Sequence, residues 1–393
     1  MLHLDVNVTR NVVILGSTGS IGQQALDVVR ANPDHLKVVG LAAGRRTDLL
    51  SAQVAEFGCR YVSAPSIQPG RKVSGASAVS LTDICQVSET DCVLVSTVGA
   101  TGLLPTLAAI KAGKTIALAN KEVLVMAGET IMGEAHAHRV PILPVDSEHS
   151  AVWQCLDGDC FVGPGITDDT VERIILTASG GAFRDHSIDQ LLTVTREEAL
   201  AHPNWVMGPK VTIDSATLMN KGFEVIEAHW LFGIPYGRID VVMHRESIVH
   251  ALVEFIDGTM KAELGPPDMR LPVQHALTYP ERRPGSWPRL RLESVGQLSF
   301  SPLERNRYPC FNLALEAAQA GGSIPTVLSA ADDVAVKLFL DGKISFTEIP
   351  NLIDRALQTH ERVTAPTVEE ILAIDEQTRR LVDSWVNRGT RRA

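Results

Sequence analysis

The chain has 393 residues, more than a single hydrophobic core usually supports, so we expect two or three domains. Its 36 Lys and Arg against 46 Asp and Glu give a net charge of −10 with the acidic residues scattered, which predicts no nucleic-acid partner and no affinity for an anionic membrane. Six cysteines without CxxC pairs, no apolar leader and no apolar run of about eighteen residues predict a cytoplasmic protein without disulfides.

Short apolar runs alternate with helical patterns in the first part of the chain. They are Val12–Leu15, Val38–Leu41, Cys92–Val95, Thr115–Leu118 and Ile142–Val145. Runs that are apolar on both faces indicate a buried parallel sheet with helical crossovers. We therefore predict an α/β fold that begins with a Rossmann-like doubly wound parallel sheet. The Ser-, Pro- and Gly-rich stretch Ser63–Ser80 predicts an irregular surface connection.

The pattern changes after about residue 150. Val171–Thr177 predicts a strand, and the runs Ile248–Ile256 and Thr259–Leu264 flank an Asp-Gly turn that is typical of a hairpin. Prolines interrupt the chain between Pro280 and Pro309, and helical periodicity follows from Phe311. We predict a Rossmann-like domain over residues 1–147, an α+β domain over 148–284, a connecting segment over 285–310 and a C-terminal helical domain over 311–393.

A glycine-rich turn, residues 16–22 (GSTGSIG), follows the first predicted strand and opens a helix over Gln23–Arg30. Such a turn presents backbone N–H groups and a helix N-terminus to a pyrophosphate, although a turn without a ligand is the alternative. The second predicted strand ends at Gly44-Arg45-Arg46, without an acidic residue nearby. Arginines there suit the 2′-phosphate of NADP(H), and two solvated arginines are the alternative.

Two carboxylates, Asp146 and Glu148, follow the fifth predicted strand. In an extended segment residues two apart point the same way, and paired carboxylates suit Mg²⁺ or Mn²⁺; an exposed acidic turn is the alternative. Further along, Asn220, Lys221 and Glu224 share one face of a predicted helix. Glu224 suits the metal and the other two suit a phosphate or hydroxyl group, with a surface ion pair as the alternative.

Two hydroxyl-bearing loops could complete an anion pocket. Ser179-Gly-Gly can form an anion-binding nest, and Ser215 precedes the Asn220 helix, although a turn residue and a helix N-cap are the ordinary interpretations. The proline-fenced loop from His202 to Gly208 carries Trp205, which suits either a lid or a subunit contact. His202 is either an anion contact or a surface histidine.

Asn120-Lys121-Glu122 follows the fourth predicted strand. Because carboxyl ends of parallel strands meet at one edge of the sheet, we expect these groups to face the same crevice as Asp146.

Five separated motifs occur in a specific order: residues 16–22 (GSTGSIG), 119–122 (ANKE), 144–149 (PVDSEH), 202–208 (HPNWVMG) and 214–224 (DSATLMNKGFE). With them the chain resembles the 1-deoxy-D-xylulose 5-phosphate reductoisomerase family over essentially its whole length. The resemblance implies an enzyme that uses NADPH and a divalent cation, Mg²⁺, Mn²⁺ or Co²⁺. It implies the rearrangement and reduction of 1-deoxy-D-xylulose 5-phosphate to 2-C-methyl-D-erythritol 4-phosphate in the non-mevalonate isoprenoid pathway, by a homodimer.

The resemblance also implies roles for individual residues. The metal ligands would be Asp146, Glu148 and Glu224, and the catalytic residues Lys121, Glu148 and Glu224. Substrate would be bound by Lys121, Ser147, Glu148, Ser179, His202, Trp205, Ser215, Asn220, Lys221 and Glu224. NADPH would be bound by Thr18, Gly19, Ser20, Ile21, Gly44, Arg45, Arg46, Asn120, Glu122 and Gly208. The sequence departs from the family pattern at Arg46, where asparagine is common, and at Ala182, where proline is common.

Two other functions fit part of the sequence. A simple NADP-dependent dehydrogenase of a phosphorylated sugar or aldehyde would need the first domain and the anion pocket, but not three carboxylates. A non-catalytic protein that senses a dinucleotide would need neither the carboxylates nor the anion pocket.

Overall fold

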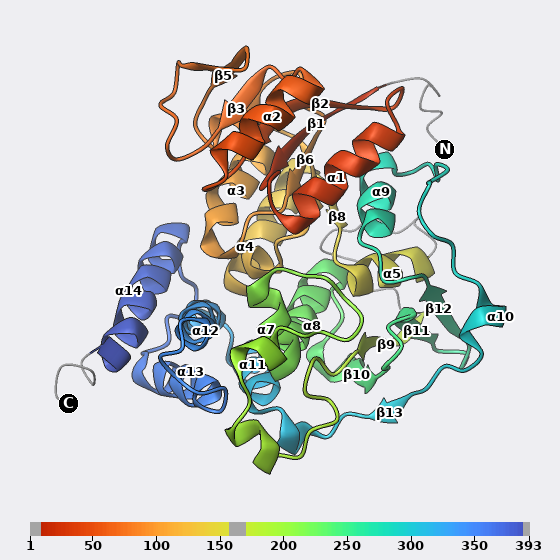
Figure 1. Ribbon diagram of the computed structural model, residues 1–393, viewed down its shortest axis with the longest axis vertical. Coiled ribbons are helices and arrows are strands. Elements are labelled where there is room, and N and C mark those ends of the chain that lie inside the picture. The colour runs from red at the N-terminus through yellow and green to blue at the C-terminus, as the bar shows by residue number, and fades with distance from the viewer. Residues whose placement is uncertain (1–8, 157–169, 388–393) are drawn as a thin grey trace. The chain divides into compact units, whose positions relative to one another are not determined.

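The computed structural model describes residues 9–156 and 170–387 (Figure 1). These residues divide into two compact units. Unit 1 comprises residues 9–120, 131–156 and 268–289 of the described chain, and unit 2 comprises 121–130, 170–267 and 290–387. Cys160 lies outside the described residues. No helix in the described ranges is long and apolar enough to cross a bilayer.

Unit 1 contains an eight-stranded sheet in the order β4-β5-β3-β2-β1-β6-β7-β8. Its strands are β1 (Arg10–Leu15), β2 (Leu36–Ala42), β3 (Tyr61–Ser63), β4 (Lys72–Val73), β5 (Ala76–Ala78), β6 (Cys92–Val95), β7 (Thr115–Leu118) and β8 (Ile142–Pro144). Neighbouring strands are parallel except β4 and β5. The apolar runs of β1 and β6 are buried on both faces, as a covered parallel sheet requires. The predicted doubly wound fold is confirmed.

One part of this prediction is wrong. Ser63–Ser80 is not wholly irregular, because it contains β4 and β5, and Ala76 and Ala78 are buried against the sheet. Strands of two and three residues are too short to leave a periodic pattern in the sequence.

The strand order places the ligand crevice of unit 1. From β1 the chain moves outward through β2 to β3, and from β6 it moves the other way through β7 to β8. Right-handed crossovers therefore put the two sets of connecting helices on opposite faces, with the switch point between β1 and β6. The helices of this part are α1 (Ser20–Ala31), α2 (Thr47–Phe57), α3 (Leu103–Lys111), α4 (Lys121–His138, in unit 2 up to Thr130) and α5 (Ser147–Cys155).

A helix from much later in the chain, α9 (Arg270–Thr278), also belongs to unit 1. It packs along α1, and Arg10 at the start of β1 donates to the Leu277 carbonyl at 2.8 Å and the Tyr279 carbonyl at 2.7 Å. On α5, the Trp153 ring lies 4.5 Å from the His275 ring. Thus α9 packs against α1 and α5, two of the helices that begin at the carboxyl edge of the sheet.

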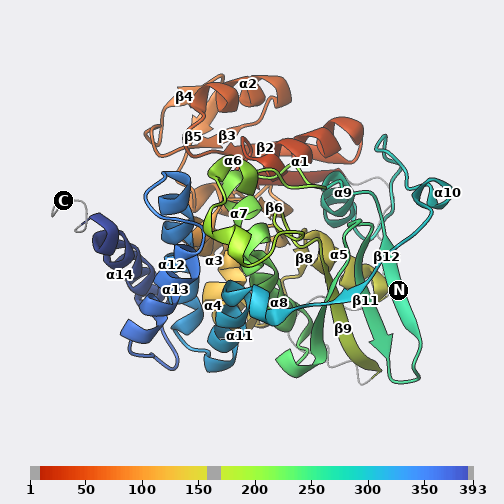
Figure 2. The same cartoon turned by 60° about the horizontal axis from the view of Figure 1, so that its bottom comes forward.

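Unit 2 contains a five-stranded sheet in the order β12-β11-β9-β10-β13. Figure 2 shows β12, β11 and β9 of this sheet side by side. The strands are β9 (Val171–Ala178), β10 (Ile239–Met243), β11 (Val249–Phe255), β12 (Met260–Leu264) and β13 (Ser301–Pro302). The antiparallel β11–β12 pair is the predicted hairpin, closed by Asp257 and Gly258, with φ +84° at Gly258 as the turn requires. The predicted connecting segment, residues 285–310, also holds the short helix α10 (Leu292–Val295).

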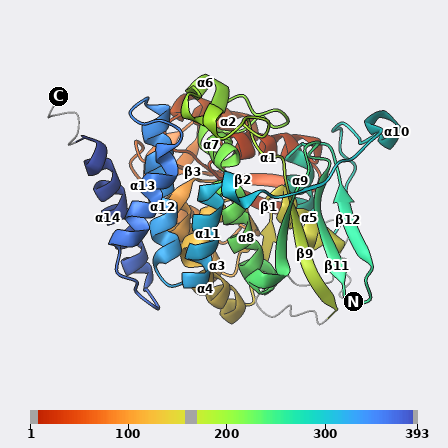
Figure 3. The same ribbon diagram turned by 90° about the horizontal axis from the view of Figure 1, so that it is seen from below.

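Helices cover the rest of unit 2. They are α6 (Arg196–Ala199), α7 (Pro209–Thr217), α8 (Met219–Phe232), α11 (Pro309–Ala320), α12 (Ile324–Leu340), α13 (Glu348–Thr359) and α14 (Val368–Asn387). Figure 3 shows α12, α13 and α14 packed side by side, with α11 between them and α8. One apolar cluster, which includes Phe223, Phe339 and Phe346 with contributions from several helices, runs through this layer. It fixes α8, which carries the predicted Asn220, Lys221 and Glu224 motif.

Candidate active site

The glycine-rich turn joins β1 to α1 in the way that a dinucleotide site requires. Gly16 has φ +86°, and a Cβ there would lie 2.4 Å from the Ser96 carbonyl oxygen. A Cβ on Gly22 would lie 2.2 Å from the Gly16 carbonyl oxygen. Gly19 is the N-cap of α1 and has no side chain to bond the first-turn N–H groups. The backbone around Thr18, Gly19, Ser20 and Ile21 can therefore approach an anion closely at a helix N-terminus.

The other predicted cofactor residues of unit 1 lie at the carboxyl ends of its strands. Gly44, Arg45 and Arg46 are exposed just after β2, and Arg46 is the N-cap of α2. Asn120 is buried after β7, where its amide donates to the Gly99 carbonyl at 3.0 Å. The arginines are thus accessible to a phosphate, whereas Asn120 is held by the neighbouring strand connection.

The Asp146–Glu148 segment is helical rather than extended. Asp146 is the N-cap of α5, and its Oδ1 accepts from the Ser147 N–H at 2.9 Å. The Ser147 hydroxyl donates to Glu148 Oε2 at 2.5 Å. The reasoning that an extended segment aligns residues 146 and 148 is therefore wrong, because the Asp-Ser pair begins a helix. The three polar side chains still meet through Ser147 at the edge of the sheet.

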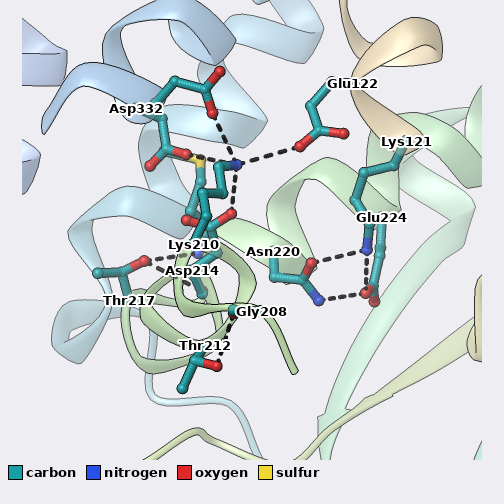
Figure 4. Close-up of polar contacts among 12 residues, drawn as sticks. Lys121, Glu122, Gly208, Lys210, Thr212, Asp214, Thr217, Asn220, Glu224 and Asp332 are labelled. Carbon is teal, nitrogen blue, oxygen red and sulfur yellow. Dashed lines mark hydrogen bonds and ion pairs between the residues drawn. The ribbon is translucent and has the colours of Figure 1, made fainter. Parts of the chain in front are cut away.

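In unit 2, Lys121 lies at the centre of a compact polar group (Figure 4). Its Nζ donates to Asn220 Oδ1 at 2.8 Å and to Glu224 Oε1 at 2.9 Å. The Asn220 amide also donates to Glu224 Oε1 at 2.5 Å, and Lys221 pairs with the second Glu224 oxygen. Lys221 and Glu224 are buried. The predicted motif on α8 is thus one hydrogen-bonded group, not a solvated surface ion pair.

A second polar group in unit 2 joins Ser179, His202 and Ser215. His202 Nε2 lies 3.0 Å from the Ser179 hydroxyl and 3.1 Å from the Ser215 hydroxyl. The backbone N–H groups of Asn204 and Trp205 both donate to His202 Nδ1. Nδ1 is therefore an acceptor, so the proton of the neutral ring lies on Nε2 and faces the hydroxyls.

Burial, reinforced by the positive charge of Arg184, lowers the pKa of His202 to about 4. The ring is therefore neutral at physiological pH. Gly180 and Gly181 follow Ser179 with φ +84° and +67°, and the Gly181 N–H donates to the Ser179 hydroxyl at 3.3 Å. Two hydroxyls and an Nε2–H beside such a turn form a donor-rich group that suits a phosphate.

The structure corrects the expected setting of Ser215. It lies inside α7, six residues after the Pro209 start, and is neither in a loop nor at an N-cap. The helix ends only at Leu218, whose φ of +56° marks the boundary with α8. The N-cap of α7 is instead Gly208, whose carbonyl oxygen accepts a hydrogen bond from the Thr212 hydroxyl at 3.0 Å (Figure 4).

The loop from His202 to Gly208 is held at both ends and exposed in its middle. Val206 is 94% exposed, whereas the Trp205 ring lies 6.0 Å from the ring of His250. His202 fixes the start of the loop through its Nδ1 contacts, and the α7 N-terminus fixes its end. Both ends of the loop are thus held, and Val206 between them is exposed.

Sequence reasoning missed two residues that shape these groups. Arg184 donates to the Ser179 carbonyl at 3.3 Å and to the Arg245 carbonyl at 2.9 Å, so it orders the Ser179 turn. Lys210 lies 3.4 Å from Glu122, the residue after Lys121. Nothing in the neighbouring sequence indicates these contacts. The local signal at Lys210 is its helical i, i+4 spacing from Asp214, with which it also pairs.

The predicted site residues thus fall into separate sets. Unit 1 carries the glycine turn, the two arginines, Asn120 and the Asp146–Glu148 group, whereas unit 2 carries the Glu224 and His202 groups together with Trp205, Glu122 and Gly208.

Comparison with known proteins identifies the family. Family models match three parts of the chain: 1-deoxy-D-xylulose 5-phosphate reductoisomerase at residues 12–128, the C-terminal domain of the same enzyme at 142–232, and the DXP reductoisomerase C-terminal domain at 264–381.

Full-length relatives agree with these matches. The 1-deoxy-D-xylulose 5-phosphate reductoisomerase of Geobacillus sp. (strain WCH70) is 50% identical over 95% of this chain and 99% of its own. That of Pelotomaculum thermopropionicum is 48% identical over 95% and 97%.

Solved structures show the same likeness. A DOX-P reductoisomerase in complex with NADPH, fosmidomycin and magnesium has a TM-score of 0.90 at 37% identity, covering 96% of this chain and 98% of its own. The enzyme from Zymomonas mobilis in complex with NADPH has a TM-score of 0.87 at 36% identity, covering 96% and 99%. The chain therefore belongs to the 1-deoxy-D-xylulose 5-phosphate reductoisomerase family.

Proposed function

We infer that the protein converts 1-deoxy-D-xylulose 5-phosphate to 2-C-methyl-D-erythritol 4-phosphate with NADPH and a divalent cation, in the non-mevalonate isoprenoid pathway. The observation that carries this function is the buried Glu224, which shares one hydrogen-bonded group with Lys121, Asn220 and Lys221. A dehydrogenase without a metal has no need for such a carboxylate, so the simple dehydrogenase alternative is not favoured.

We propose that Asp146, Glu148 and Glu224 are the metal ligands. All three offer carboxylate oxygens, the donor type that Mg²⁺ and Mn²⁺ prefer, and the donor set therefore fits the cation. A bound divalent cation supplies Lewis-acid polarisation of a carbonyl and an adjacent hydroxyl. Ser147 orients Glu148 through its hydroxyl and Asp146 through its backbone N–H.

We propose that the remaining polar residues hold the substrate. Ser179, Ser215 and the Nε2–H of His202 would donate to the phosphate, and Lys221 and Asn220 would contact it or the neighbouring hydroxyls. Lys121 is placed by two acceptors with its ammonium beside Glu224, where it can donate to a reacting oxygen. Because His202 is neutral, it contributes a directed hydrogen bond rather than a positive charge.

The cofactor, NADPH, supplies the hydride when bound. We propose that the turn at Thr18, Gly19, Ser20 and Ile21 holds its pyrophosphate at the N-terminus of α1. Gly44, Arg45 and Arg46 would hold the 2′-phosphate, and Asn120, Glu122 and Gly208 would supply further contacts. Most of the proposed NADPH contacts thus lie in residues 1–147 and most of the metal and substrate contacts in 148–284, while Lys121, Asp146 and Ser147 come from the first range and Gly208 from the second. Residues 285–310 would connect these parts to a supporting helical domain, 311–393.

The loop with Trp205 would close over bound substrate. Its exposed Val206 tip and fixed ends support this role, because closure would cover apolar surface and exclude water from a reactive aldehyde.

We also propose a cytoplasmic homodimer. Apolar side chains at the end of the β11–β12 hairpin and beside the sheet of unit 2 are exposed, namely Ile256 at 64%, Met260 at 47% and Phe300 at 48%. A second copy would cover this patch and the outer edge of β12. The solution mass of the protein tests this assembly.

The function is tested by oxidation of NADPH in the presence of 1-deoxy-D-xylulose 5-phosphate, with and without a chelator. We expect turnover that stops on chelation and returns with Mg²⁺ or Mn²⁺. Turnover that persists after complete metal removal would favour the simple dehydrogenase, and binding of NADPH without any turnover would favour a sensor.

A further inference from the structure

Lys210, at the start of α7, lies at the centre of a cluster of carboxylates. Its Nζ is 2.5 Å from Asp214 Oδ2 and 3.1 Å from Asp332 Oδ2 (Figure 4). It is also 3.4 Å from Glu122 Oε1 and 3.5 Å from Asp333 Oδ1. Because these carboxylates come from α4, α7 and α12, one ammonium connects three helices of unit 2. We call this group the Lys210 cluster.

The Lys210 cluster is buried and strongly acidic. The Asp214 and Asp332 side chains are 2% and 0% exposed, and that of Lys210 is 23% exposed. Burial, together with the nearby Asp332 carboxylate, raises the pKa of Asp214 well above its usual range. Burial alone would lower the pKa of Lys210, but its carboxylate neighbours raise it, so the ammonium keeps its proton.

Such a cluster is costly to bury, because each charge loses its hydration and must be stabilised by its partners. Replacing a buried ion-pair cluster by apolar side chains is often neutral or stabilising, so the charges of this cluster point to a role in placing a neighbour. Glu122 is the member of the cluster that adjoins the proposed active site. It follows Lys121 in the first turn of α4, and Lys121 donates to Asn220 and Glu224 of α8.

Figure 4 shows the Glu122 and Lys121 side chains leaving this turn toward different partners, Lys210 and Glu224 respectively. The first turn of α4 is therefore tied to α7 and to α8 at successive residues.

We propose that Lys210 is a positioning residue, which holds the first turn of α4 through Glu122 so that the Lys121 ammonium reaches Asn220 and Glu224. The role assigned to Lys121 rests on the proposed function, whereas the geometric coupling between Lys210 and Lys121 does not. The competing structural role is a simple tether from α7 to α12 through Asp332 and Asp333, which would leave α4 unaffected.

Two carboxylate variants separate these roles. Glu122→Gln removes the cluster's charge on α4, and Asp333→Asn removes one on α12, where Asp333 also pairs with Arg379 at 2.7 Å. The readout is the rate at which a water-soluble acetylating reagent modifies Lys121, followed by mass spectrometry without NADPH. Lys121 is 12% exposed, and the 70% exposed Lys337 in the same sample is the internal standard.

The quantity compared is the acetylation rate of Lys121 divided by that of Lys337. We expect Glu122→Gln and Lys210→Met to raise this ratio severalfold over that of the unaltered protein, and Asp333→Asn to leave it unchanged. At saturating NADPH and substrate, the first two variants should lower kcat about ten- to a hundredfold, as small misplacements of catalytic groups do. Lys210→Arg keeps the charge and should recover most of kcat. Lys337→Met is the matched lysine control for turnover only, because it removes the acetylation standard, and its kcat should match that of the unaltered protein.

Lys210→Met leaves several buried carboxylates without their cation and can fail to fold; in that case Glu122→Gln decides. Unchanged Lys121 acetylation in Glu122→Gln, or an equal rise in Asp333→Asn, overturns the inference and leaves the α7–α12 tether. If the unaltered protein shows no turnover, the proposed function fails, but the acetylation result still decides whether Lys210 places Lys121.

Discussion

Replacing Glu224 by glutamine tests the proposed metal site most directly. Glu224 Oε1 accepts from Lys121 and Asn220, and Oε2 pairs with Lys221. The single oxygen of a glutamine amide can occupy the Oε1 position and keep the first two donors. Its NH₂ group would then face the Lys221 ammonium, which loses its acceptor.

The stability cost follows from these contacts. One buried charge-assisted hydrogen bond is lost, which costs about 1–3 kcal/mol, less than the roughly 3–5 kcal/mol of a fully broken buried pair because one acceptor remains. Divalent-metal affinity should fall much more, since a neutral amide replaces an anionic ligand. Changes that only touch a metal ligand already cost 10- to 100-fold, so we expect kcat/KM to fall at least about a hundredfold.

The assay combines metal titration by calorimetry, NADPH binding by fluorescence, steady-state turnover and denaturant unfolding. NADPH affinity should be unchanged, and Glu316→Gln, an exposed change on α11, is the control for loss of a carboxylate. Near-normal turnover with unchanged metal affinity would remove Glu224 from the metal site. A loss of stability above that of a broken buried pair would show that the amide does not keep the Lys121 contact.

Four further outcomes are expected. Gly22→Ala should destabilise the protein by about 1–3 kcal/mol in denaturant unfolding and weaken NADPH binding, because its Cβ would lie 2.2 Å from a carbonyl oxygen of the same turn. Replacing both Arg45 and Arg46 by alanine should reduce the preference for NADPH over NADH by about ten- to a hundredfold in kcat/KM; equal use of both cofactors by the unaltered protein would contradict the assignment. His202 has a folded pKa of about 4 against about 6.5 in the unfolded chain, so its contribution to stability is complete above pH 6.5 and is lost as pH falls toward 4; His202→Gln should flatten the unfolding free energy over that range. Trp205→Ala should raise KM and lower kcat/KM without changing the solution mass, whereas dissociation with normal kinetics would make the loop a subunit contact.

The strands of the parallel sheet could be predicted because their signal is local. β1, β6 and β7 are continuous apolar runs buried on both faces, and the β11–β12 hairpin has its Asp-Gly turn in the sequence. The two-residue β4 has no such signal. The packing of α9 in unit 1 also has none, since Arg10 of β1 and its two acceptors at the end of α9 are 267 and 269 positions apart.

The site residues were predictable by type more than by setting. Asp146 and Glu148 were expected in an extended segment, but a strand end followed by Asp-Ser also fits a helix cap, and the structure has the cap. The prediction for Ser215 was wrong for a related reason. The sequence pattern indicated a loop followed by one helix, whereas the structure has two helices, α7 and α8, separated by the single αL residue Leu218.

Whether a charged side chain is buried is the feature that the sequence predicts least well, because it depends on partners from distant parts of the chain. Lone charged residues are usually solvated, and Arg45 and Arg46 are indeed exposed. By the same reasoning Lys221 and Glu224 would lie on a surface, yet both are buried, where they pair with each other and Glu224 also accepts from Lys121 of a helix about a hundred residues earlier. The same lysine depends on groups from α8 for its own position. A carboxylate and its ammonium partners that are each too costly to bury alone are thus stable only together, and this mutual dependence keeps Lys121 and Glu224 in fixed positions before substrate arrives.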